Sequence, residues 1–178
     1  DGSLFLHTGV TLLETLVSFF AVVFLGLVAA LLLWSCRSLA EILEPFLVML
    51  NSLPKSALAP LLIVWLGNNM NTIIVAAVSV ALFGSILTLY TGFASLDQDQ
   101  IKLFKVLLPG SLPMIISNMK VNIGLCLVGV IIGEFLSSKA GLGYLITYGS
   151  QTFAMTMVVT SIVVLCLLSV VLYQCIAL

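Results

Sequence analysis

Residues 12–33 read LLETLVSFFAVVFLGLVAALLL, an apolar run with a single acidic side chain. A helix needs roughly 20 consecutive apolar residues to cross the hydrocarbon layer of a bilayer, which is about 30 Å thick. This run has that length, and 62% of the whole chain is hydrophobic while only 7% is charged. A soluble domain of 178 residues would need more charged surface than this chain can supply. The run therefore predicts the first of several membrane-spanning helices.

Further apolar runs follow at Ala57–Leu66, Ile73–Leu89, Met114–Ile132 and Met155–Tyr173. The later three approach spanning length, and the short one reaches it when Phe46–Leu53 is added. We therefore expect about five spanning helices in one transmembrane domain over residues 1–178. The expected fold class is all-α and polytopic.

Polar residues, glycines and prolines mark the boundaries of the expected helices. We expect helices at Thr11–Trp34, Pro45–Gly67, Thr72–Gly92, from Pro109 or Pro113 to Ile132, and at Thr152–Tyr173. A polar link is expected at Ser35–Glu44, and a glycine-rich excursion between spans at Gly133–Gln151. Pro54 lies inside the second helix, and its missing N–H and ring clash predict a break there.

Basic residues set the expected orientation. With five spans, Arg37, Lys102 and Lys105 fall on one side of the membrane and Lys139 on the other. Lysine and arginine are enriched in cytoplasmic loops. The side that carries Arg37 is therefore expected to be cytoplasmic.

Residues 95–113, SLDQDQIKLFKVLLPGSLP, form a charged segment between two expected spans. Its charged residues lie close together: Asp97, Asp99, Lys102 and Lys105. Asp97 with Gln100 can cap a short helix, on which Ile101 and Phe104 share an apolar face. Such a helix either docks in a groove of a soluble partner or lies against the membrane surface.

Catalytic and metal-binding patterns are missing from the sequence. It contains no G-x-x-x-x-G-K-[ST], H-E-x-x-H or G-x-S-x-G motif, and His7 is its single histidine. The four cysteines have no metal-ligand spacing and are expected to be small buried side chains: Cys36, Cys126, Cys166 and Cys175. We expect no catalytic residue, no metal and no cofactor in this chain, and the net charge of −1 gives no reason to expect nucleic-acid binding.

Lys120 lies within the expected fourth span, where a charged side chain costs at least ~2.5 kcal/mol at mid-bilayer. Asn118 and Asn122 flank it and stack on one face of the helix. These three residues either line a translocation path, or Lys120 extends its ammonium group to the cytoplasmic interface or caps a neighbouring helix.

Asn51, Ser52 and Lys55 surround the expected break at Pro54. A broken helix frees backbone polar groups, which are tolerated only inside protein or beside water. These residues either line a path or mark a plain kink.

Two glutamates complete the set of charged residues near the spans. Glu134 follows the fourth span and is expected to be a gate, an ion-pair partner of Lys139, or an ordinary interfacial charge. Glu14 is placed in the first turn of the first helix, where a carboxylate suits the helix dipole. Small residues within the spans are expected to be packing surfaces: Gly26, Ala29, Ala30, Ala76, Ala77, Ala81, Gly124 and Gly129.

Several short motifs occur in a fixed order between Thr11 and Tyr173. They are Leu43-Glu-Pro45, Leu53-Pro54, Pro60-Leu-Leu-Ile-Val-Trp-Leu-Gly67, Leu107-Leu-Pro-Gly-Ser-Leu-Pro113, Gly133-Glu-Phe-Leu136 and Gly141-Leu-Gly-Tyr-Leu-Ile146. This order resembles the permease core of bacterial ATP-binding-cassette (ABC) importers of type I, the binding-protein-dependent inner-membrane component family. It is most similar to the nitrate/sulfonate/taurine branch, which includes transporters for thiamine-precursor pyrimidines.

The resemblance implies a cytoplasmic coupling helix within residues 95–108 that slots into an ATPase subunit. The residues it assigns to that contact are Asp97, Asp99, Gln100, Ile101, Lys102, Leu103, Phe104 and Lys105. The family's E-A-A triplet is replaced here by Lys102-Leu103-Phe104, and no glycine lies between Gln100 and Pro109. We expect that part of this loop near 106–107 is missing, and that the first family helix would precede Asp1.

The resemblance implies a permease subunit, not an enzyme, that pairs with a second copy to form a solute path. Its implied partners are cytosolic ATPases, which bind ATP and magnesium, and an extracytoplasmic binding protein. The implied location is the bacterial cytoplasmic membrane, and the implied solute is a small anion of the sulfonate or nitrate type or a thiamine-precursor pyrimidine. Two alternatives remain: a gradient-driven carrier using Lys120 or Glu134, and a membrane scaffold subunit without a path.

Overall fold

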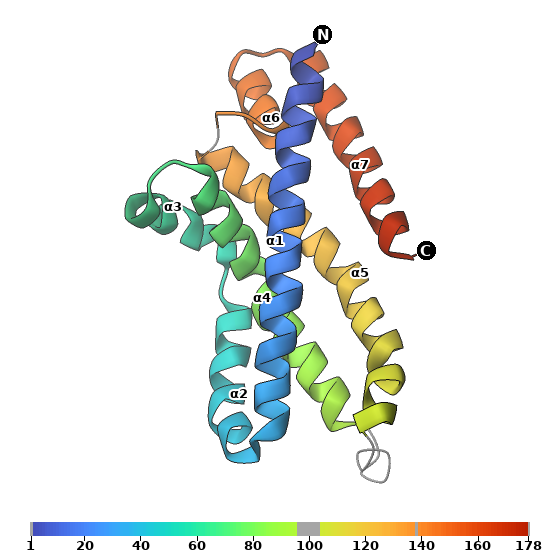
Figure 1. Ribbon diagram of the computed structural model, residues 1–178. Helices are drawn as coiled ribbons and strands as arrows, with labels where there is room; N and C mark the ends of the chain where they lie inside the picture. The colour runs from blue at the N-terminus through green and yellow to red at the C-terminus, as the bar shows by residue number, and fades with distance from the viewer. Residues whose placement is uncertain (1, 96–103, 138, 178) are drawn as a thin grey trace.

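The computed structural model describes residues 2–95, 104–137 and 139–177, and these ranges contain helices but no strands (Figure 1). The seven helices are α1 (Gly2–Ser35), α2 (Arg37–Ser52), α3 (Lys55–Leu66), α4 (Met70–Ala94), α5 (Phe104–Ser137), α6 (Leu142–Gln151) and α7 (Met155–Ala177). The expected all-α fold is confirmed.

Four helical segments in the described ranges are long and apolar enough to cross a membrane: Ser3–Ser35, Met70–Ala94, Leu112–Ser137 and Met155–Ile176. A fifth span arises if α2 and α3 are taken together, as Arg37–Ser52 followed by Ala57–Leu66. The two parts are bent by 100°. The structure therefore agrees with the expectation of about five spans and makes one of them discontinuous.

The break between α2 and α3 lies at Leu53 and Pro54, where the sequence predicts it. Both residues have extended backbone angles, and the proline precedes the first residue of α3. A proline lacks an N–H and clashes with the preceding helical turn, so the ladder of α2 stops before it.

Several predicted boundaries are wrong. The expected polar link Ser35–Glu44 is mostly helical, because α2 already begins at Arg37. The expected excursion Gly133–Gln151 is largely helical too, since α5 continues to Ser137 and α6 follows.

Helix starts were also misplaced. The first helix begins at Gly2 instead of Thr11, so Glu14 lies well inside α1 and not in its first turn. The fourth expected helix begins at Phe104, before Pro109 and Pro113. Apolar periodicity locates the middle of a long helix more reliably than its ends.

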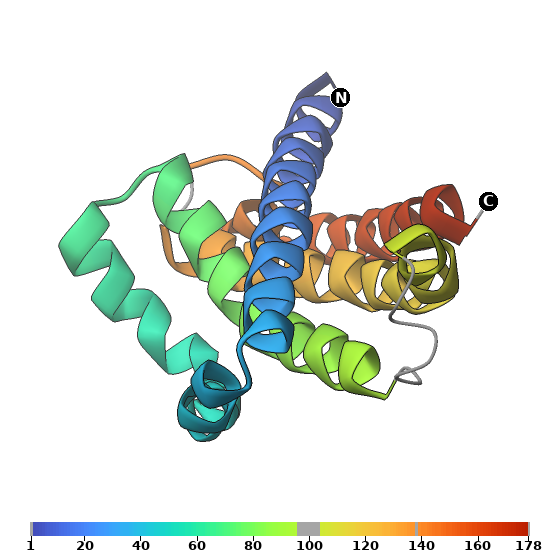
Figure 2. The ribbon, with the colours of Figure 1, turned by 60° about the horizontal axis from the view of Figure 1, so that its bottom comes forward.

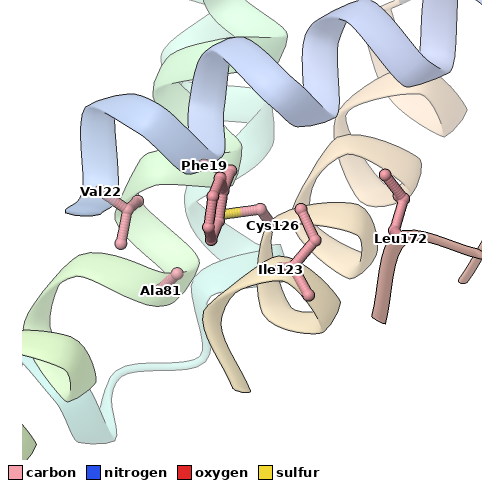
Figure 3. Close-up of a cluster of buried hydrophobic side chains, with 6 residues drawn as sticks. All are labelled: Phe19, Val22, Ala81, Ile123, Cys126 and Leu172. Atoms are coloured by element: carbon pink, nitrogen blue, oxygen red, sulfur yellow. The ribbon is translucent and has the colours of Figure 1, made fainter. Parts of the chain in front are cut away.

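The core forms where α4 packs against α1 and α5. Figure 3 shows one cluster in which side chains from α1, α4, α5 and α7 converge: Phe19, Val22, Ala81, Ile123, Cys126 and Leu172. Small residues bring the helices close, because a Cβ added at Gly129 would lie 2.6 Å from the Cα of Ala77. Gly124 differs from this expectation, since nothing lies within 4 Å of the corresponding position.

The cysteines separate into two kinds. Cys126 is buried as expected, while Cys36, Cys166 and Cys175 are exposed, contrary to expectation. All four are free thiols.

The two ends of the helix bundle carry different connections. The α1–α2 connection, the end of α4 and the start of α5 lie at the bottom of Figure 1, while the N-terminus and α6 lie at the top. Figures 1 and 2 place α2 and α3 beside α4, on the side away from α7. We refer to the α6 end as the outer end, following the orientation predicted from the basic residues.

Candidate functional site

The α2–α3 break lies about halfway along the bundle (Figure 1), and polar side chains form hydrogen bonds there. The Lys55 ammonium group donates to Asn51 Oδ1 and to the Val80 carbonyl oxygen, each at 3.1 Å. Val80 lies near the middle of α4. Asn51 approaches α4 closely because Gly84 has no side chain, and a Cβ there would lie 3.3 Å from Asn51 Oδ1.

The three predicted residues at the break are not enclosed. Asn51 and Ser52 are exposed and Lys55 is half-buried. The Ser52 hydroxyl donates to the Val48 carbonyl oxygen at 2.9 Å. The break thus presents an amide, a hydroxyl and an ammonium group at one open edge of the bundle.

Asn118 and Asn122 have a different environment. Both are buried between α4 and α5, where Ser85 Oγ donates to Asn118 Oδ1 at 2.9 Å. Asn122 Nδ2 donates to Ser85 Oγ at 2.8 Å and also contacts Asn118 Oδ1. Gly26 of α1 makes room for this cluster, since a Cβ there would lie 2.9 Å from Ser85 Oγ. This geometry joins α4 to α5, and a path-lining role for the two asparagines stays a prediction.

Lys120 turns toward α7. It is half-buried, and its Nζ lies 6.0 Å from the centre of the Tyr173 ring, within range of a cation–π interaction. It lines a cavity of about 50 Å³ with Gly124 and Ser169. The structure therefore does not bring Lys120 together with its neighbours Asn118 and Asn122.

Glu134 is almost fully enclosed, with 1% of its surface exposed. Its Oε1 accepts a hydrogen bond from the Thr11 hydroxyl, and its Oε2 accepts one from the Gly143 N–H, both at 2.6 Å. An ordinary interfacial charge would be hydrated, so that expectation is wrong. The considered ion pair with Lys139 is absent as well, because Arg37–Glu41 is the only ion pair in the described ranges.

Side chains of other helices cap the N-terminus of α6. The first residues of a helix have N–H groups without helical partners, and Gly141 offers no side chain to bond them. Other helices supply the acceptors: His7 Nδ1 accepts from the Gly141 N–H at 2.9 Å, and Thr11 Oγ1 accepts from the Leu142 N–H at 2.8 Å. Glu134 accepts the third bond, and its negative charge suits the positive end of the α6 dipole.

Two glycines make this cap possible. Gly141 has a φ of +110°, and a Cβ there would lie within 2.2 Å of a Glu134 carboxyl oxygen. A Cβ at Gly143 would lie 2.8 Å from the Glu134 Cβ. The sequence pattern Gly133-Glu134 followed by Gly141-Leu-Gly143 is therefore explained by one close contact between α5 and the start of α6.

We call the contact of α1 and α5 with the start of α6 the outer junction. Glu14 belongs to this junction, a role that the sequence analysis missed. Its side chain is 2% exposed, and its carboxyl group lies near that of Glu134. A polar stripe at helical spacing, formed by His7, Thr11 and Glu14, was the available signal.

A cavity of about 240 Å³ adjoins this outer junction. Glu14, Asn68, Ser137 and Lys139 contribute to its lining. Asn68 Oδ1 accepts from the Ser137 hydroxyl at 3.1 Å, while Glu14 Oε2 has no hydrogen-bond partner. The cavity thus lies between Glu14 and the α3–α4 connection.

The predicted coupling residues are mostly outside the described ranges. Asp97, Asp99, Gln100, Ile101, Lys102 and Leu103 belong to residues that the structure does not describe. Phe104 and Lys105 begin α5, and only their backbone is described. The role of this segment stays a prediction.

Comparison with known proteins agrees with the helical arrangement. The family model for the binding-protein-dependent transport system inner membrane component matches residues 22–177. A protein of Haemophilus influenzae named "Probable ABC transporter permease protein" is 32% identical over 94% of this chain and 73% of its own length. The taurine transport system permease protein TauC of Escherichia coli is 23% identical, over 95% of this chain and 66% of its length.

A third relative is the formylaminopyrimidine transport permease protein ThiX of Halalkalibacterium halodurans. It is 24% identical, over 81% of this chain and 62% of its own length. The chain thus spans between three fifths and three quarters of these relatives. It belongs to the family of binding-protein-dependent inner-membrane components, the multi-pass permease subunits of ABC transporters in the cytoplasmic membrane.

Proposed function

We propose that this chain forms the solute pathway of an ATP-driven importer and that the α2–α3 break is part of that pathway. The break carries the argument: an exposed amide, an exposed hydroxyl and a half-buried ammonium group lie about halfway along the bundle. Lipid does not solvate such groups, so water or a second protein surface must cover them.

A second copy of this chain supplies that cover in the proposal. The outward faces of α2 and α3 carry large exposed apolar side chains beside the polar edge: Ile42, Phe46, Met49, Leu61, Val64 and Trp65. Two such surfaces facing each other would enclose a polar channel between apolar rims. Cysteines introduced at Ser52 of both copies should cross-link in the assembled complex, in a variant without the four native cysteines. Failure to cross-link at any stage of the ATP cycle would contradict this arrangement.

In the proposal, segment 95–108 contacts a cytosolic ATPase and transmits the free energy of ATP hydrolysis to the permease. An extracytoplasmic binding protein delivers solute to the outer end, where α6 lies. The family implies partners of these kinds, and the proposal places their contacts on this chain.

The test is ATP hydrolysis by the reconstituted complex of permease, ATPase and binding protein. Deletion of residues 97–105 should abolish the stimulation of hydrolysis by solute-loaded binding protein, while membrane insertion is retained. The matched control is the double variant Arg37→Ala, Glu41→Ala, which removes an exposed ion pair at the same end of the bundle and should hydrolyse ATP normally. Undiminished stimulation in the deletion variant would overturn the proposed coupling.

The proposed solute is a small anion of the sulfonate type. Lys55 at the open edge supports this choice, as does the relative named for taurine, whose acid group is a sulfonate. The relative named for formylaminopyrimidine keeps a thiamine-precursor pyrimidine as the alternative. Solute binding to the partner binding protein distinguishes the two.

One observation favours a second candidate, a proton-driven carrier. Glu14 and Glu134 are both almost fully buried within the spans, and buried carboxyl groups are where such carriers hold their protons. The discriminating measurement is uptake into proteoliposomes with either ATP or a proton gradient as the energy source. Uptake driven by the gradient alone, and lost in Glu134→Gln, would favour the carrier.

A further inference from the structure

Lys55 has hydrogen-bonding capacity that the protein does not use. A lysine ammonium group has three donors. Two of them are directed to Asn51 Oδ1 and the Val80 carbonyl oxygen, both of which are neutral acceptors. One donor and the full positive charge therefore remain available at the half-exposed end of the side chain.

No carboxylate of the described ranges neutralises this charge. Those ranges contain four carboxyl groups, and none is ion-paired with Lys55: Glu14, Glu41, Glu44 and Glu134. Glu44 is the nearest along the chain, and it lies about two helical turns before the end of α2. A cation at this depth is costly, so an uncompensated one indicates an anion that comes and goes.

The bonds to Asn51 and Val80 also fix the position of the ammonium group. A free lysine would extend to the nearest interface, as long side chains near helix ends do. The bond to Val80 instead holds the Lys55 ammonium group beside the middle of α4. Lys120 provides the contrast, because its charge lies over the Tyr173 ring on the α7 side of the bundle.

We infer that Lys55 and Asn51 form an anion-binding site in the α2–α3 break, which takes the negatively charged group of the passing solute. The ligand class is a small monoanion such as a sulfonate or carboxylate, held by the free donor of Lys55 and by the Asn51 amide. This inference rests on the proposed pathway through the break. It adds a charge preference and names the residue that sets it.

The test measures charge preference without knowing the solute. In the reconstituted complex lacking the four native cysteines, Ser52→Cys places a thiol three residues from Lys55. Its reaction rate is measured with two methanethiosulfonate reagents of similar size, one bearing a sulfonate and one a quaternary ammonium group. The sulfonate reagent should react faster, and added Lys55→Met should lower the ratio of the two rates about tenfold.

Control variants separate charge from folding. Lys55→Arg should retain the preference for the anionic reagent, and Lys120→Met should leave the ratio unchanged. Equal ratios in Lys55→Met and its parent would overturn the anion site while leaving the pathway intact. A thiol that reacts with neither reagent would overturn the pathway and the site together. A normal charge preference without ATP-driven transport would contradict the importer and leave the site standing.

Discussion

The outer junction and the α2–α3 break contain similar polar groups, yet they use them in opposite ways. At the junction, both oxygens of Glu134 and the first three N–H groups of α6 and its cap are bonded within the protein. At the break, Lys55 keeps a free donor and Asn51 and Ser52 are exposed. The comparison teaches that saturation of hydrogen bonds, more than the presence of charge, separates a structural polar cluster from a binding surface.

The largest loss of stability at the outer junction is expected from substitution of Glu134. Glu134→Ala removes the acceptor of two short bonds and leaves the Gly143 N–H unsatisfied inside the bundle. We expect a loss of about 3 kcal/mol in the free energy of unfolding, typical of breaking a buried charged network. Unfolding in mixed detergent micelles measures it, with the exposed Glu44→Ala as control. Equal stability of the two variants would show that the junction is not saturated as described.

A smaller effect is expected from the backbone of the junction. Gly141→Ala forces a side chain into a φ of +110° and against the Glu134 carboxyl group, so we expect roughly 2–3 kcal/mol of destabilisation. Gly67, which ends α3, also has a positive φ of +83°, but its nearest neighbour would be 3.4 Å away. Gly67→Ala should therefore cost about 1 kcal/mol from backbone strain alone. Equal melting temperatures of the two variants would contradict the close contact at Gly141.

An intermediate loss of stability is expected at the buried cluster of Asn118, Asn122 and Ser85. Asn122→Ala removes the donor to Ser85 Oγ and should destabilise the bundle by about 1–2 kcal/mol. If Asn122 instead faces a water-filled path in the assembled transporter, stability will hardly change and transport will fall. Melting temperature and transport rate, measured on the same preparation, separate these outcomes.

The smallest effect on stability is expected at the break. Asn51 is exposed, and Asn51→Ala should leave the melting temperature unchanged while weakening retention of the anionic reagent or solute at Lys55. Reaction rates of the Ser52→Cys thiol provide the readout. A large drop in melting temperature would mean that the break, like the junction, is a structural cluster.

Composition and apolar runs were enough to predict the helical membrane fold, and Pro54 located the broken span. Both follow from local physics: the length of a hydrocarbon layer and the missing N–H of proline. The same local reasoning failed at Glu14, because α1 begins at Gly2, nine residues before the predicted start at Thr11.

The outer junction could not be derived from the sequence for a different reason. Thr11 and Glu134 are separated by 123 positions, and the His7 bond to Gly141 by 134. No single helix shows such a pairing, since it depends on how α1 lies against α5 and α6. Residues at the break are near neighbours in sequence, which is why Asn51, Ser52 and Lys55 could be singled out together.

The capping of α6 by side chains of α1 and α5 has a consequence for biogenesis. This ten-residue helix is too short to be stable alone in water, and its first N–H groups find acceptors only on α1 and α5. It can therefore acquire its native shape only after α1 and α5, which are far apart along the polypeptide, have met. Formation of α6 thus reports that α1 and α5 have already packed together in the bilayer.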